Sequence, residues 1–350
     1  MEINWTDQSS HVFLNPRLNF AFDQKLIQRR RPSHIWLATS GSAKIVGLNK
    51  QAILSSADAV NKFINSSEKD IWLQILPEFH IGGLSIYARS YLSGAKVVTH
   101  HFGLGKWDAN KFTALLNESG ATLISLVPTQ IYDLVKNKIV APHSLRYVFV
   151  GGADLENWLY MEAKKLKWPI APTYGMTECS SQVATANLED SRMRVLPHVK
   201  LRVSEMGKII LMGPSLFTEY CMIGEGGDLA YHDPKIGYEF LTEDFGDLAD
   251  GYLKPLGRGK DFIKVGGEGV YLNRLRGVLH SFQFEEGLEG EFDLESRPHA
   301  RLGKTIDLVT TVDEPKVKAL VEKFNNTVMP YERIQGVRKV DQIPRGELGK

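Results

Sequence analysis

Short apolar runs alternate with segments of helical period between residues 34 and 166, and this alternation constrains the fold more than any other feature. The run His34–Ala38 is typical of a strand buried on both faces, and the segment 51–63 after it has apolar residues at helical spacing. The same order repeats, with predicted strands at 96–99, 123–127, 146–150 and 169–172 and predicted helices at 108–117, 128–136 and 155–166. Alternating strands and helices indicate an α/β layer with a largely parallel sheet.

After about residue 195 the pattern changes to short strands and turns, which predicts a β-rich subdomain. The glycine-rich segment 257–269 then indicates a hinge. The residues after it have a pattern of their own, with two predicted helices and a strand, which is enough for a small domain. The predicted fold is therefore α/β, with a large domain over 1–259 and a small, mobile α+β lid over 260–350.

The charge balance and the cysteine content exclude several classes of protein. Lys plus Arg number 42 and Asp plus Glu number 41, so the net charge of +1 gives no general attraction to nucleic acid or to anionic membranes. The two cysteines, Cys179 and Cys221, form neither a disulfide framework nor a zinc motif. No apolar stretch approaches the roughly 20 residues that span a bilayer, and the N-terminal segment has no apolar signal core. We expect a cytoplasmic protein without nucleic-acid partners.

Two segments carry side chains suited to phosphate and metal chemistry. Thr39–Lys44 combines small hydroxyl residues, glycine and a lysine, so its backbone N–H groups can surround phosphate oxygens. We expect this loop between a strand and a helix. Thr173–Glu178 places a hydroxyl beside a carboxylate at the end of a predicted strand, which suits a Mg²⁺ ion bound to phosphate. Each segment alone is also typical of an ordinary turn.

Three further segments carry isolated polar groups. His80 lies between an aromatic residue and paired glycines, where it can line a pocket or simply pack in a loop. The carboxylate of Asp244 suits ribose hydroxyls, and Arg258 suits a phosphate or ribose. Lys350 stands in a glycine-flanked segment, 344–350.

The order and spacing of these segments resemble the adenylate-forming superfamily of acyl-CoA synthetases, peptide-synthetase adenylation domains and luciferases, from about residue 35 to residue 350. The resemblance implies ATP, Mg²⁺ and coenzyme A as cofactors and a small carboxylic acid as substrate. The catalytic residues that it implies are Thr177, Glu178, Arg258 and Lys350. Of these, Glu178 is implied to hold Mg²⁺. The implied ATP and AMP contacts are Thr39, Ser40, Gly41, Ser42, Lys44, Gly151, Gly152, Ala153, Tyr174, Gly175 and Asp244.

Two half-reactions are implied by the same resemblance. The acid first attacks the α-phosphorus of ATP and expels pyrophosphate, while Mg²⁺ and Lys350 stabilise the developing charge. The lid then rotates about Lys260, which removes Lys350 and presents Gly266 and Gly267 to coenzyme A. The chain departs from the family pattern in a shorter phosphate loop and a shorter segment before it. It also has Gly269 and Arg276 where asparagine and an acidic residue are common.

The segments 171–185 and 195–198 most resemble the o-succinylbenzoate–CoA ligases of menaquinone and phylloquinone synthesis. That resemblance implies an aromatic dicarboxylate, with Ser180, Ser181 and Gln182 near the carboxylate that is not activated and His80 on the acyl side. An exposed loop is the alternative for the three polar residues. A ligase for another aryl or fatty acid, a non-catalytic nucleotide-binding relative and an adenylation domain serving a separate carrier protein stay open. So does a homodimer.

Overall fold

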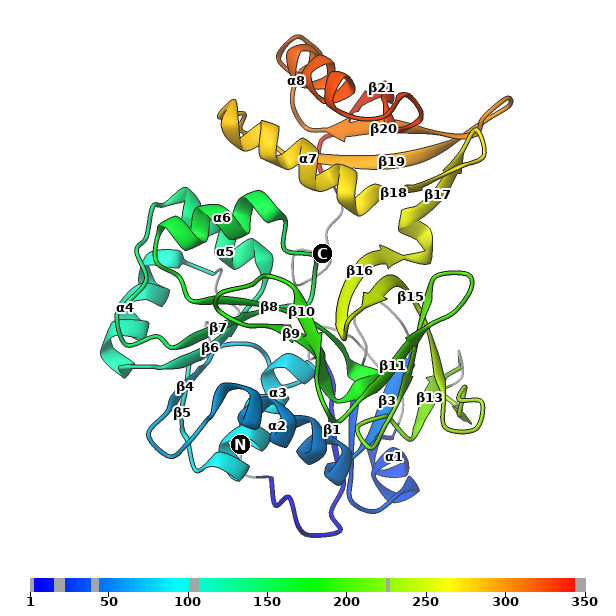
Figure 1. The fold of residues 1–350 in the computed structure, drawn as a ribbon. Helices are drawn as coiled ribbons and strands as arrows, with labels where there is room; N and C mark the ends of the chain where they lie inside the picture. Colours follow the sequence, from blue (N-terminus) through cyan, green and yellow to red (C-terminus); the bar gives the residue numbers. More distant parts are fainter. Residues whose placement is uncertain (1–2, 16–22, 39–43, 101–106, 225–226, 344–350) are drawn as a thin grey trace.

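The computed structural model describes residues 3–15, 23–38, 44–100, 107–224 and 227–343, and Figure 1 shows their arrangement. Its largest sheet runs in the order β11-β12-β15-β16-β10-β9-β8-β7-β6-β4-β5. One half of this sheet is parallel and made of β4 (Ile71–Gln74), β5 (Lys96–Thr99), β6 (Leu123–Leu126), β7 (Tyr147–Val150) and β8 (Ile170–Met176). The α/β fold class predicted from the alternating pattern is confirmed.

Helices cover both faces of the parallel half, which explains why its strands are apolar throughout. Neighbouring residues of one strand point to opposite faces, so Leu73 and Trp72 of β4 belong to different apolar clusters. The Leu73 cluster packs against α4 (Ala109–Ser119), α5 (Pro128–Lys136) and α6 (Asn157–Lys165). The Trp72 cluster packs against α2 (Lys50–Ile64) and α3 (Ile81–Ser93).

The remaining strands of the first two sheets are mostly antiparallel. The large sheet continues through β9 (Ser181–Ala186), β10 (Met193–Val195), β11 (Lys200–Val203), β12 (Lys208–Met212), β15 (Phe240–Ala249) and β16 (Tyr252–Arg258). The second sheet contains β1 (His11–Phe13), β2 (His34–Ala38), β3 (Lys44–Asn49), β13 (Glu219–Ile223) and β14 (Leu229–His232), with α1 (Gln24–Arg30) preceding β2. The strands after residue 195 agree with the predicted β-rich subdomain, while β1, β2 and β3 join its second sheet from the N-terminal part of the chain.

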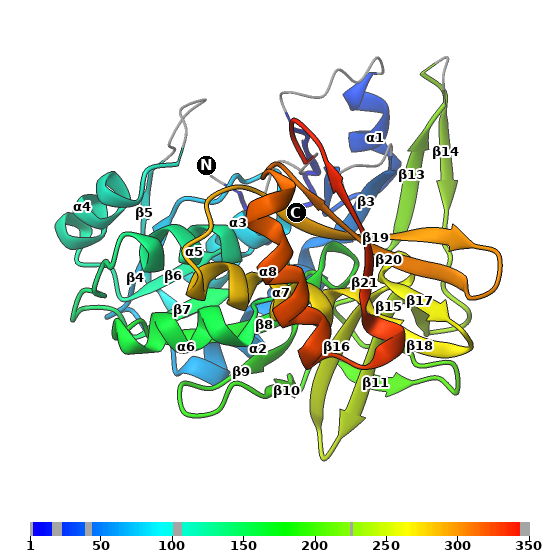
Figure 2. The same cartoon turned by 90° about the horizontal axis from the view of Figure 1, so that it is seen from above.

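The last described residues form a layer of their own, here called the C-terminal unit (residues 262–339). It contains β17 (Phe262–Val265), β18 (Glu268–Tyr271), α7 (Leu272–Glu285), β19 (Phe292–His299), β20 (Gly303–Thr310), α8 (Glu314–Thr327) and β21 (Ile334–Lys339). Its buried apolar side chains form a cluster drawn only from residues 263–334. Seen from above, α7 lies next to α6 (Figure 2). The separate core supports a boundary near residue 260, which stays a prediction.

The position of strand β3 shows that one prediction, the helix directly after the phosphate loop, is wrong. The phosphate loop was expected between a strand and a helix, but Lys44 begins a strand that pairs antiparallel with β2. A short apolar run such as residues 45–48 fits the interior of a sheet as well as a helix. Here it forms a strand because it pairs with a strand on each side. Gly47 allows this pairing to pack, because a Cβ there would lie 2.6 Å from the Trp36 ring.

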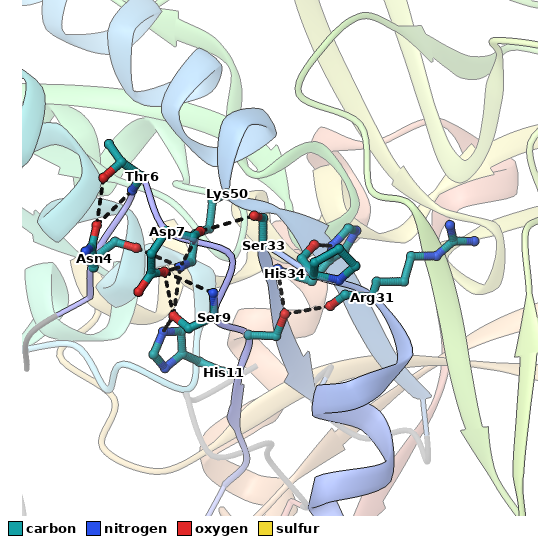
Figure 3. A network of polar contacts seen from close by, with 11 residues as sticks. Asn4, Thr6, Asp7, Ser9, His11, Arg31, Ser33, His34 and Lys50 are labelled. Carbon is teal, nitrogen blue, oxygen red and sulfur yellow. Dashed lines mark hydrogen bonds and ion pairs between the residues drawn. The ribbon is translucent and has the colours of Figure 1, made fainter.

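A buried lysine holds the N-terminal segment, which has no sequence period (Figure 3). The ammonium of Lys50, at the start of α2, donates to the Asp7 carboxylate at 2.5 Å, to the Asn4 carbonyl at 2.6 Å and to the Ser9 hydroxyl at 3.2 Å. These bonds satisfy a cation whose side chain is only 2% exposed. Among the helices that the structure describes, none is long and apolar enough to cross a membrane.

Candidate active site

The Tyr174–Glu178 segment lies where the parallel half of the large sheet meets its antiparallel half. Strand β8 ends at Met176 and passes into a 3₁₀ turn, η1 (Thr177–Cys179). Only glycine fits at position 175, because a Cβ there would lie 2.0 Å from the Ser181 carbonyl oxygen of β9. The close approach of β8 and β9 therefore positions the hydroxyl and carboxylate of the segment at the carboxyl end of a sheet strand, where α/β folds bind ligands.

Asp244 brings together two other predicted residues. One of its carboxylate oxygens accepts a hydrogen bond from the Tyr174 hydroxyl at 2.8 Å, and the other accepts one from Nε of Arg258 at 3.0 Å. Burial raises the pKa of Tyr174 well above its usual value, and the neighbouring Asp244 charge adds to the effect. The phenol therefore stays a donor, and an aromatic ring, a carboxylate and a guanidinium from β8, β15 and β16 meet at one place.

Glu178 is held from β13. The hydroxyl of Tyr220 donates to Oε1 of Glu178 at 2.9 Å, and burial, then the Glu178 charge, raise the pKa of this phenol. In the part of the chain that the structure describes, no group of three or more His, Cys, Asp or Glu side chains could hold a metal ion. A single half-buried carboxylate fits a Mg²⁺ ion that is bound mainly by nucleotide phosphates.

The predicted adenine-side loop follows β7, the strand next to β8. Gly151 lies against this neighbour, since a Cβ at that position would be 2.4 Å from Oγ1 of Thr173. Gly152 has a φ of +86°, which favours glycine. Gly151, Gly152 and Ala153 are thus placed beside the Thr173–Glu178 segment, at the carboxyl ends of adjacent parallel strands.

The three polar residues after Glu178 are buried, so the exposed-loop alternative for them is wrong. Ser180 donates to the Ser215 carbonyl at 2.7 Å, and Gln182 accepts from Thr185 at 2.8 Å. Ser181 instead points to α3, where its hydroxyl donates to the Ser85 hydroxyl at 3.3 Å. It has a φ of +117°, a strained conformation for a residue with a side chain. His80 precedes the same helix as its N-cap residue.

Arg89 of α3 was not predicted, and it is the most unusual charge in the structure. It is 1% exposed, and its Nη2 donates to the Ser181 hydroxyl at 3.2 Å. The guanidinium lies 5.5 Å from the Trp72 ring and 5.6 Å from the Phe149 ring, while its Nε and Nη1 have no hydrogen-bond partner among the described residues. Burial lowers the pKa of Arg89 to about 9. An arginine four residues after Ser85, within an apolar segment, was the available signal.

Other predicted residues have fewer described contacts with the candidate site. Lys44 begins β3, and its Nζ lies 5.3 Å from the centre of the Tyr220 ring. Gly266 and Gly267 form the turn between β17 and β18, with φ values of +60° and +94°. Several predictions lie outside the described residues, namely Thr39, Ser40, Gly41, Ser42, Lys350 and the side chain of Lys260.

This arrangement agrees with a family assignment made from the sequence. A family model described as AMP-binding enzyme matches residues 38–227. The chain belongs to the family of AMP-binding enzymes.

Two relatives identify the kind of ligase to which this chain is similar. The 2-succinylbenzoate–CoA ligase of Lactococcus lactis subsp. lactis is 30% identical over 326 residues, which are 89% of this chain and 67% of the relative. The corresponding ligase of Bacillus velezensis is 29% identical over 84% of this chain and 62% of the relative. The chain thus spans about two thirds of the length of these relatives.

A solved structure of the o-succinylbenzoate CoA synthetase of Bacillus subtilis with its acyl-adenylate intermediate has the same fold. It is 25% identical and superposes with a TM-score of 0.79 over 90% of this chain and 67% of that one. The same synthetase with ATP and magnesium ion gives a TM-score of 0.76 at 24% identity. The predicted resemblance to the o-succinylbenzoate–CoA ligases is confirmed.

Proposed function

We propose that this chain is an AMP-forming acid–thiol ligase that activates o-succinylbenzoate with ATP and transfers the acyl group to coenzyme A. The observation that carries the proposal is the meeting of Tyr174, Asp244 and Arg258, with Glu178 a few residues along the same segment. Two distant parts of the sequence, the Tyr174–Glu178 segment and the β15–β16 hairpin, thus provide a ring, a ribose-binding carboxylate, a cation and a metal-binding carboxylate. The 2-succinylbenzoate–CoA ligase names of the relatives support the same reaction.

In the first half-reaction, an oxygen of the substrate carboxylate bonds to the α-phosphorus of ATP as the bond to pyrophosphate breaks. We assign the ribose to Asp244, the phosphates to Thr177 and Lys44, and the metal to Glu178. Mg²⁺, when bound, supplies positive charge to the phosphate oxygens. Lys350 is proposed to stabilise the same charge. In the second half-reaction, the thiol of coenzyme A bonds to the acyl carbon, loses its proton and releases AMP.

Arg89 supports a dicarboxylic acid over a simple aryl or fatty acid. An arginine without a carboxylate partner in a buried site is costly, and an anionic group of the substrate can offset that cost by a charge-assisted hydrogen bond. Ser181 lies against Arg89 and close in sequence to Glu178. We therefore assign the second carboxylate of o-succinylbenzoate to Arg89 and Ser181. The hydrocarbon chain of a fatty acid has no second anionic group to pair with Arg89.

We propose that residues 260–350 form a lid that turns about Lys260, and that the turn containing Gly266 and Gly267 faces coenzyme A. The separate apolar core of residues 263–334 supports the lid. A cytoplasmic location and a homodimer stay predictions.

The test is a product assay with Mg-ATP, coenzyme A and o-succinylbenzoate, with benzoate and octanoate as control acids and mass spectrometry of AMP and acyl-CoA. We expect AMP and succinylbenzoyl-CoA with the first acid only. Acyl-CoA from a control acid instead contradicts the substrate assignment and keeps the ligase. ATP binding without acyl-adenylate or AMP from any acid favours the non-catalytic relative, and an acyl-adenylate without acyl-CoA favours an adenylation domain that serves a carrier protein.

A further inference from the structure

We infer that Tyr220 is a positioning residue for the carboxylate of Glu178, the group that the proposed function assigns to Mg²⁺. The inference rests on that function and adds a residue that no sequence motif singled out. Tyr220 lies on β13, is 8% exposed, and donates its hydroxyl hydrogen to Oε1 of Glu178 at 2.9 Å. The phenol orients one carboxylate oxygen, and the other oxygen is the one that we assign to the cation.

The residues just before Tyr220 also contact the main chain of Glu178. The backbone N–H of Phe217 donates to the Glu178 carbonyl oxygen at 2.8 Å. The Phe217 ring packs against the Tyr220 ring with their centres 4.6 Å apart. Residues 217–220 therefore form hydrogen bonds with both the backbone and the carboxylate of Glu178. These two bonds restrict rotation of the Glu178 side chain.

Tyr220 contacts the predicted phosphate-binding lysine as well. Strands β3 and β13 are antiparallel, with Tyr220 opposite Val46 and Met222 opposite Lys44. This register lets the Lys44 ammonium lie over the Tyr220 ring, 5.3 Å from its centre. One phenol thus contacts the proposed metal ligand through its hydroxyl and the proposed phosphate ligand through its ring face.

A merely structural role for Tyr220 predicts a different outcome from a positioning role. The ring belongs to an apolar cluster with Phe217 and Phe240, and Tyr220→Phe keeps that packing while removing only the hydroxyl. If packing is the whole role, the variant behaves like the wild type. If the hydroxyl orients Glu178, metal binding weakens, because loss of a partner of this kind typically lowers metal affinity about 10- to 100-fold.

The experiment measures Mn²⁺ bound to the full chain by electron paramagnetic resonance, in the presence of a non-hydrolysable ATP analogue. We expect Tyr220→Phe to raise the Kd of Mn²⁺ by about tenfold, with metal-free AMP binding unchanged. The matched control is Tyr231→Phe on the neighbouring strand β14, where the hydroxyl pairs with the Cys221 thiol instead. This control should bind Mn²⁺ like the wild type.

A double-mutant cycle with Glu178→Gln completes the test. We expect removal of the Tyr220 hydroxyl to have no further effect in the Glu178→Gln background. An unchanged Mn²⁺ Kd in Tyr220→Phe, or an equal loss in both backgrounds, overturns the inference and leaves the proposed function intact. A wild type that binds no Mn²⁺ with the nucleotide analogue overturns the proposed function together with it.

Discussion

Arg89 is a buried charge that has no carboxylate partner among the described residues. Its fully buried guanidinium has a hydroxyl and two aromatic rings as described neighbours, so its burial works against folding. By contrast, Arg146 forms an ion pair with Asp70, a carboxylate that is 3% exposed. Arg146 thus contributes to stability, whereas Arg89 fits a role in binding an anionic ligand.

Arg89→Met should separate these two roles. We expect a melting temperature equal to or above that of the wild type, and a KM for o-succinylbenzoate at least about tenfold higher, since a charge-assisted hydrogen bond contributes about 1.5–3 kcal/mol. The KM for ATP should not change. The control Arg146→Met should instead lower the melting temperature, because Asp70 loses its partner in a buried site. A KM for the acid that stays at the wild-type value contradicts the assignment.

Gly175 gives a second prediction for a single residue. Gly175→Ala puts a methyl group 2.0 Å from the Ser181 carbonyl oxygen, which must push β8 and β9 apart and displace Glu178. We expect a lower melting temperature, measured by differential scanning calorimetry, and a loss of adenylate formation, measured by pyrophosphate release. Gly277→Ala is the control, since its nearest neighbour would be 3.6 Å away and alanine favours a helix. Equal behaviour of the two variants argues against the steric explanation.

At the scale of elements, the sequence predicts the strands and helices whose apolar pattern lies within their own residues. The parallel strands are apolar throughout, and helix α4 begins at a clear cap, Asp108, whose carboxylate accepts from the backbone N–H groups of Asn110 and Lys111. Helix α3 was missed because Gly82 and Gly83 stand in its first turn and its apolar residues show no clean stripe. Strand β1 and helix α1 were missed because their placement depends on distant partners.

The same division applies to the candidate site. Tyr174, Glu178, Asp244 and Arg258 lie in motifs that a sequence displays directly. Arg89 and Tyr220 become recognisable only through contacts with residues 92 and 42 positions away, respectively. Their neighbours follow from sheet register and helix packing, which no local pattern encodes.

The Lys50 network predicts how the N-terminal segment is held. Lys50→Met removes the donor to Asn4, Asp7 and Ser9, so hydrogen exchange at residues 4–13 should become faster while the parallel strands keep their protection. Lys62→Met on the same helix is the control, because its pair with Asp58 is exposed. An unchanged exchange rate at residues 4–13 contradicts this role.

Acid should act on the same network. The hydrogen bond from Lys50, followed by one from Ser9, lowers the pKa of Asp7 to about 2. A depressed carboxyl pKa contributes stability that is present above the unfolded value of 3.8 and is lost as the pH falls toward 2. Exchange at residues 4–13 should therefore accelerate over this pH range in the wild type. In Lys50→Met the acceleration should be much smaller, and an identical pH profile counts against the mechanism.

At the scale of the whole molecule, helix α7 of the C-terminal unit contacts helix α6, which covers one face of the large sheet. Nδ1 of His280 on α7 lies 2.5 Å from the carboxylate of Glu156, which caps α6, and the Phe284 ring stacks on Trp158. Burial lowers the pKa of His280, but the hydrogen bond and charge of Glu156 outweigh it, so the pKa is raised. Asp293 adds to this rise, and Asp154 lies near Glu156.

This contact should respond to pH. A raised histidine pKa means that the ion pair is complete below the ordinary value of 6.5 and is lost as the pH rises through the raised value. Energy transfer between labels at Lys111→Cys on α4 and Glu322→Cys on α8 should therefore fall with rising pH. His280→Gln should abolish the change, while the exposed control His143→Gln keeps it. A pH profile that survives in His280→Gln excludes the contact as its cause.

The pairing of β3 with β13 has a consequence for protein synthesis. Strand β3 is complete at Asn49, but its second partner begins only at Glu219. A nascent chain released between these points carries an apolar strand with an open edge, which is a template for aggregation. The C-terminal unit has no such delay, since its strands find partners among close neighbours in the chain. The open edge of β3 can therefore be covered only after β13, which ends at Ile223, has emerged from the ribosome.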